Sequence, residues 1–177
     1  MTILALLPLS HAEMVGAWLF DETSGDIITD YSGNGHHGEI IGKVQRQPQG
    51  KRGRALEFFE DNNHAPNWLW GHVLVPHHDD TNLLEFTTMA WIKNPELVEP
   101  GFGEGSISQA LLGKTSPISR SNYMMWIWGK EPGARGEDGH VTLGFTVTKP
   151  LWASVSLEKT KAGANVIDGN WHHVAGT

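Results

Sequence analysis

Residues 86–93 read Phe-Thr-Thr-Met-Ala-Trp-Ile-Lys, and residues 168–175 read Asp-Gly-Asn-Trp-His-His-Val-Ala. Both stretches are rich in the aromatic and β-branched side chains that fit a pleated surface. The second stretch begins with Asp-Gly-Asn, a sequence typical of a turn. We predict that each stretch forms a β-strand and that the turn precedes the second strand.

Similar short stretches recur along the chain, separated by turns rich in Gly, Asn, Asp and Pro. No stretch shows a convincing helical period. Short strands at this density, joined by such turns, indicate an all-β, two-sheet antiparallel sandwich. The further predicted strands are residues 15–20, 27–29, 37–41, 54–59, 72–75, 110–114, 123–128, 141–148 and 152–157.

The composition narrows the classes of function. The chain has 177 residues, no cysteine, and 13 basic against 20 acidic residues, which gives a net charge of −7. The absence of cysteine excludes a disulfide scaffold and a thiol nucleophile. The acidic balance, without a basic stripe, argues against a nucleic-acid partner. No apolar run reaches the roughly 18 residues of a membrane span, so we predict none.

The amino terminus has the form of a signal peptide. Residues 2–9 are a short apolar stretch, and Ser10 and Ala12 place small residues before a cleavage point. This order is typical of the end of a secretory signal, although a basic segment before it is missing. We predict a signal-peptide remnant at residues 1–12, one domain at 13–177, and a secreted or cell-surface protein. The alternative is an apolar first strand.

Three sets of segments, taken in order, resemble the LamG-like jellyroll family, a branch of the concanavalin A-like lectins and glucanases. They are residues 16–25 with 30–38, residues 53–58 with 73–76 and 86–93, and residues 168–175. The resemblance implies a two-sheet antiparallel jellyroll. In the family, further strands follow the Trp-His-His-Val-Ala strand, and one carries an acidic residue that helps to complete a metal site. Since the sequence stops at Thr177, we expect a domain truncated at its C-terminus.

The loop at residues 30–38 is the candidate cation site. Asp30 and Asn34 offer side-chain oxygens, and Asp21 follows the strand predicted at 15–20. Calcium prefers such oxygen ligands on a tightly turned loop. Domains of the resembling family often bind calcium here, which supports Asp21, Asp30 and Asn34 as ligands. The alternative is an Asx-turn, in which Asp30 and Asn34 bind only backbone groups.

Four tryptophans are candidates for a sugar-binding platform, because exposed aromatic rings stack on the apolar faces of sugars. The alternative for each pair is packing between the sheets. The first pair lies in a loop-like stretch and the second alternates along a predicted strand. They are Trp68 with Trp70 and Trp126 with Trp128.

Other aromatic residues are predicted to fill the core. Trp18, Trp91 and Trp171 lie in the strands that carry the family resemblance, and His173 is expected on the core side beside Trp171. Pairs of adjacent histidines do not predict zinc, because neighbouring residues on a strand face opposite ways.

Catalysis is not predicted. The related glucanases carry three carboxylates on one strand face, and a retaining mechanism needs two carboxyls about 5 Å apart. No such run occurs in the sequence. We therefore predict a non-catalytic extracellular binding module, with a polysaccharide, a glycoprotein glycan or another extracellular protein as partner. The alternatives are a structural or protein-interaction domain of a larger surface protein, and a relative of the glucan hydrolases.

Overall fold

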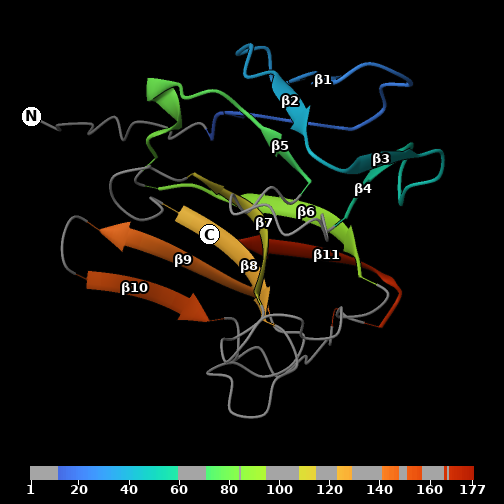
Figure 1. Cartoon of the computed structure of the whole chain (residues 1–177). Coiled ribbons are helices and arrows are strands. Elements are labelled where there is room, and N and C mark those ends of the chain that lie inside the picture. The colour runs from blue at the N-terminus through green and yellow to red at the C-terminus, as the bar shows by residue number, and fades with distance from the viewer. Residues whose placement is uncertain are drawn as a thin grey trace, which may run out of the picture. The chain divides into compact units, whose positions relative to one another are not determined.

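The computed structural model describes residues 12–59, 71–83, 85–94, 108–114, 123–128, 141–147, 151–156, 166 and 168–177. Within these residues, regular structure consists of β-strands and one short 3₁₀ helix (Figure 1). Every strand pairing among the described residues is antiparallel. This confirms the all-β class. The chain divides into two compact units, Met1–Asn82 and Leu83–Thr177. The prediction of one domain over 13–177 stays a prediction.

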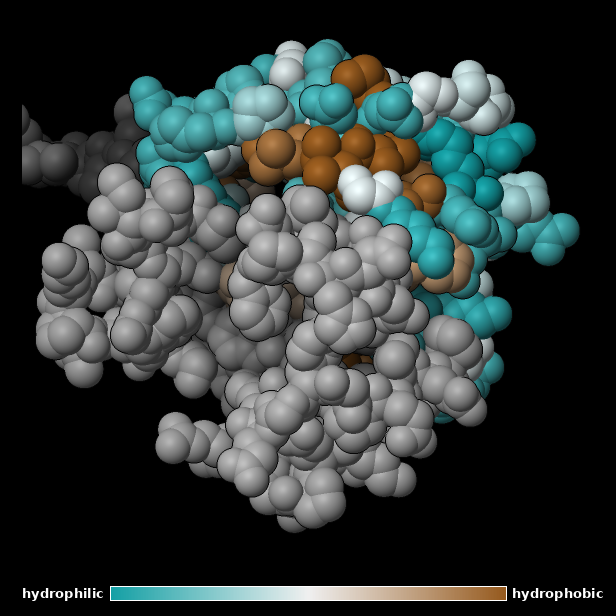
Figure 2. Space-filling view, in the orientation of Figure 1, coloured by the Kyte–Doolittle hydropathy of each residue, from teal (hydrophilic) through white to brown (hydrophobic). Residues whose placement is uncertain are grey.

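The first unit contains a three-stranded sheet in the order β1-β2-β5 and a two-stranded β3-β4 pair. Across the larger sheet, Ile27, Glu39 and Leu74 lie opposite one another, and all three are exposed, while Ile28 on the other face is fully buried. Figure 2 shows hydrophobic side chains gathered on one face among hydrophilic ones. The elements are β1 (Ile27–Ile28), β2 (Gly38–Ile41), β3 (Val44–Gln47), β4 (Ala55–Phe58), β5 (His72–Leu74) and the 3₁₀ helix η1 (Asp79–Thr81).

The second unit contains a four-stranded sheet in the order β10-β9-β8-β7 and a two-stranded β11-β6 pair. Its core joins the two sheets, because Met125 and Ile127 of β8 cluster with Val174 of β11, and Ala90 and Ile92 of β6 pack against them. The strands are β6 (Thr88–Lys93), β7 (Ser108–Lys114), β8 (Tyr123–Trp128), β9 (Val141–Val147), β10 (Leu151–Ser156) and β11 (Trp171–Gly176).

Most predicted strands are present, with ends shifted by one or two residues. The strand predicted at residues 15–20 is wrong: this segment makes only an isolated bridge between Trp18 and Asp30. Leu19 is exposed, and Phe20 has a φ of 62°, in the left-handed region that interrupts an extended strand. The pattern also missed β3, whose Val-Gln-Arg-Gln sequence is mostly polar.

No helix among the described residues has the length and apolar character to cross a membrane. The predicted signal-peptide segment, residues 1–12, lies outside the described residues except for Ala12.

Candidate functional site

One buried carboxylate holds the loop at residues 30–38 together. Asp30 is only 5% exposed. Its Oδ1 accepts hydrogen bonds from the backbone N–H groups of Ala17 and Ser32, each at 2.9 Å. Its Oδ2 accepts from the Ser32 hydroxyl at 2.7 Å and from the His36 N–H at 3.0 Å. A carboxylate offers about four lone-pair sites. The four donors therefore occupy its acceptor capacity.

These hydrogen bonds also set the charge of the loop. Burial by itself raises the pKa of the Asp30 carboxyl. The hydrogen bond from the Ser32 side chain and those from the backbone of Ala17, Ser32 and His36 lower the pKa by more, so that it lies well below its ordinary value. The carboxylate is therefore ionised, and its bonds are of the stronger charge-assisted kind.

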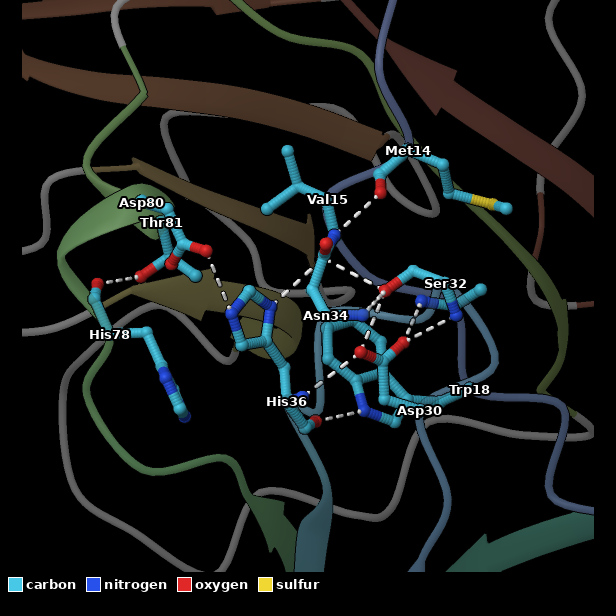
Figure 3. A network of polar contacts seen from close by, with 11 residues as sticks. Met14, Val15, Trp18, Asp30, Ser32, Asn34, His36, His78, Asp80 and Thr81 are labelled. Atoms are coloured by element: carbon cyan, nitrogen blue, oxygen red, sulfur yellow. Dashed lines mark hydrogen bonds and ion pairs between the residues drawn. The ribbon is translucent and has the colours of Figure 1, made fainter.

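The rest of the loop is tied to the segment that precedes β1. The Asn34 side-chain amide donates to the carbonyls of Met14 at 2.9 Å and Val15 at 3.0 Å. The Trp18 indole N–H donates to the His36 carbonyl at 2.8 Å. Figure 3 shows these side chains converging around Asp30. Side-chain contacts thus fix the loop in addition to the Trp18–Asp30 bridge and the β1–β2 pairing at its ends.

The three predicted calcium ligands do not share one set of contacts. Oδ1 of Asp21 accepts the Arg54 N–H at 2.8 Å and so binds the residue just before β4. Asp30 makes the Asx-turn contact to Ser32, and the Asn34 amide donates to carbonyls. A calcium ion at Asp30 would compete with four donors for the same oxygens. Calcium binding by Asp21, Asp30 and Asn34 stays a prediction.

Three other side chains of the first unit, one from the loop, one from η1 and one from the residue before η1, form a group that could hold a metal. The His36 ring is 1% exposed, and its Nε2 lies 3.1 Å from Oδ2 of Asp80. The His78 ring lies with its centroid 4.3 Å from that of His36. One ligand atom from each residue lies within 4.8 Å of the other two. His36 precedes His78 by 42 positions and Asp80 by 44, so no short spacing in the sequence predicts the group.

In the second unit, the face of β6–β11 opposite the core carries an aromatic pair. Trp91 lies opposite His173 in the register, and their ring centroids are 5.0 Å apart at 46°. Trp91 is 39% exposed and Met89, two residues before it, 58%. The prediction of Trp91 and His173 as core residues is therefore wrong. Strand alternation turns the smaller Ala90 and Ile92 toward the core instead.

The predicted platform tryptophans cannot be compared with this pair. Trp68 and Trp70 lie outside the described residues. Trp126 and Trp128 lie in β8, where the structure describes their backbone but not their side chains. Their role in ligand binding stays a prediction.

Comparison of the chain with protein-family models, with curated proteins and with solved structures gave no match. The likeness to LamG-like domains therefore rests on the sequence segments alone.

Proposed function

We propose that the chain is a non-catalytic carbohydrate-binding module with a LamG-like, two-sheet jellyroll fold, acting outside the cell. The observation that carries this proposal is the exposed Trp91 with its cross-strand neighbour His173. An indole ring presents a flat apolar face with an electron-rich centre, and the apolar face of a sugar ring stacks on such a surface.

Polar groups flank the aromatic pair on the same face. Lys93 follows Trp91 by two residues, is exposed, and lies opposite the half-buried Trp171. Alternate residues of a strand are about 6.6–6.8 Å apart, so Lys93 lies within reach of a sugar stacked on Trp91. Its ammonium group offers three donors, and the His173 ring adds another polar group for sugar hydroxyls. The face therefore combines a stacking surface with hydrogen-bonding groups.

The charge of the chain favours one class of glycan. A net charge of −7 repels polyanionic chains such as sulfated or uronic-acid polysaccharides. We therefore expect a neutral polysaccharide or a neutral glycan of a glycoprotein. Stacking of a sugar on Trp91 does not require calcium, so sugar binding and binding of the predicted calcium ion are independent of each other.

The test is affinity electrophoresis of the full chain through gels that contain neutral or acidic polysaccharides, with calcium and with chelator. Retardation by at least one neutral polysaccharide is the expected result. Unchanged mobility in every gel would overturn the carbohydrate proposal and leave the alternative, a structural or protein-interaction domain. Bovine serum albumin run in the same lanes controls for sieving by the gel.

A further inference from the structure

The group formed by His36, His78 and Asp80 carries an inference that is independent of carbohydrate binding. It belongs to the first unit, whereas Trp91 and His173 belong to the second. We propose that His36, His78 and Asp80 bind a divalent transition-metal ion, with Zn²⁺ as the best fit and one coordination position open to an outside ligand.

The orientation of His36 supports this proposal first. Its Nδ1 lies 2.9 Å from the carbonyl oxygen of Val15. A carbonyl accepts only, so Nδ1 carries the hydrogen, and Nε2 is the ring atom that faces Asp80. Metal-ligating histidines are held in this way, with one ring N–H donated to a backbone carbonyl and the other nitrogen presented to the ion.

The loop fixes the position of the same ring. The backbone N–H of His36 donates to the Asp30 carboxylate, and the backbone carbonyl of His36 accepts the Trp18 indole N–H. The ring is almost completely buried. A ligand held this firmly loses little conformational freedom when an ion binds, which favours affinity.

The segment that carries His78 and Asp80 is held by hydrogen bonds within its own turn. The Thr81 hydroxyl donates to the His78 carbonyl at 2.6 Å, and the Asn82 N–H donates to the Asp79 carbonyl at 3.0 Å. Figure 3 shows the Asp80 carboxylate reaching toward the His36 ring. The neighbouring residues His77 and Asp79 form a separate exposed pair. The pairs His36-His37 and His77-His78 therefore each contribute one histidine to the group.

The ligand types select the metal. Two imidazoles and one carboxylate suit zinc and similar first-row ions, whereas calcium and magnesium take oxygen ligands. Ligand bonds of about 2.0–2.2 Å at the tetrahedral angle place two ligand atoms about 3.3–3.5 Å apart. The separation of 3.1 Å between Nε2 of His36 and Oδ2 of Asp80 is close to this value.

The exposure of the group indicates an open position. The Asp80 side chain is 59% exposed, whereas His36 is 1% exposed. An ion held between them is thus buried on one side and meets solvent on the other. Three protein ligands leave a fourth tetrahedral position for water or an outside ligand.

The test is titration of the full chain with Zn²⁺ in a calorimeter, with His78→Ala and Asp80→Asn as test variants. His77→Ala and Asp79→Asn are matched controls, since they change the adjacent exposed residues. We expect the tightest zinc-binding event to weaken at least tenfold in both test variants and to keep its Kd within twofold in both controls. A rise in melting temperature on adding Zn²⁺, present in the controls and reduced in the test variants, is the second readout.

Three outcomes would overturn the proposal: no zinc binding by the unaltered chain, test variants that bind as the unaltered chain does, or an equal loss in the control variants. The first two would leave His36 and Asp80 as an ordinary ion pair. Should His78→Ala fail to fold, Asp80→Asn decides the matter, since its side chain is largely exposed. Polysaccharide binding, measured in parallel, distinguishes loss of this site from loss of the proposed function.

Discussion

Trp91 and His173 face each other across β6 and β11 with ring centroids 5.0 Å apart, on the side of the strands that is turned away from the core. A large aromatic residue stays exposed here because the opposite side is already filled by Ala90, Ile92 and Val174 against β8. This face therefore presents Trp91, 39% exposed, beside His173.

Asp30→Ala is expected to destabilise the first unit strongly. The substitution leaves the part-buried N–H of Ala17 and the buried N–H of His36 without their acceptor, and an unsatisfied buried group costs about 1–3 kcal/mol. We expect the free energy of unfolding to fall by about 3 kcal/mol or more, measured by urea denaturation. Asp21→Ala, which removes one exposed hydrogen bond, is the control and should cost about 1 kcal/mol or less. Equal losses in the two variants would contradict the role given to Asp30.

The contribution of Asp30 should depend on pH. Hydrogen bonds lower its pKa in the folded chain below the value of about 3.9 expected in the unfolded chain. The stabilisation is thus fully present above pH 5 and is lost as the pH falls through 4 toward the folded-state pKa. The difference in unfolding free energy between the unaltered chain and Asp30→Asn should be constant from pH 7 to 5 and shrink by pH 3. A difference that stays constant down to pH 3 would count against this account.

Asp168 provides a matched control for that pH series. Its pKa is also lowered, first by the hydrogen bond with the His172 side chain and then by Asn170, but its carboxyl is exposed. Solvent screens an exposed pair, so Asp168→Asn should change stability little at any pH. A pH-dependent loss as large as that of Asp30→Asn would show that burial is not what makes Asp30 important.

Alternation along the sequence identified most strands, including both members of the β6–β11 pair. It could not say which face of a strand is buried. Trp91 is predicted in the core because it lies in a strand that carries the family resemblance. In the structure, the partly buried Ala90 and Ile92 of this strand pack against the core instead. Alternation separates two faces, and only tertiary packing decides which of them meets another sheet.

The sequence does not predict the candidate metal ligands, for a different reason. The two facing histidines come from separate His-His pairs, and their meeting depends on how the loop at 30–38 approaches η1. Adjacent histidines on a strand face opposite ways, which argues against two neighbouring histidines binding the same metal ion. The same argument does not exclude a metal site that takes one histidine from each of two pairs. Asp30, in contrast, was recognisable from its Asx-turn sequence.

Calcium binding is tested by melting curves with millimolar calcium and with chelator. If Asp21, Asp30 and Asn34 bind calcium, we expect a higher melting midpoint with calcium than with chelator. A ligand at 100-fold its Kd adds about 2.7 kcal/mol to the free energy of unfolding. Asn34→Ala should remove the calcium-dependent part of the shift. An unchanged midpoint would contradict the calcium prediction and leave Asp30 with its four hydrogen bonds alone.

The sugar-binding role proposed for Trp91 is measured by the affinity of Trp91→Ala for the neutral polysaccharide that retards the unaltered chain. We expect the affinity to fall about tenfold or more, equivalent to about 1.4 kcal/mol, because the stacking surface is lost. Trp91→Phe, which keeps an aromatic ring, should retain part of the affinity. Met89→Ala, which trims an exposed side chain on the same face, should bind as the unaltered chain does. Equal affinity of Trp91→Ala and Met89→Ala would contradict the claim.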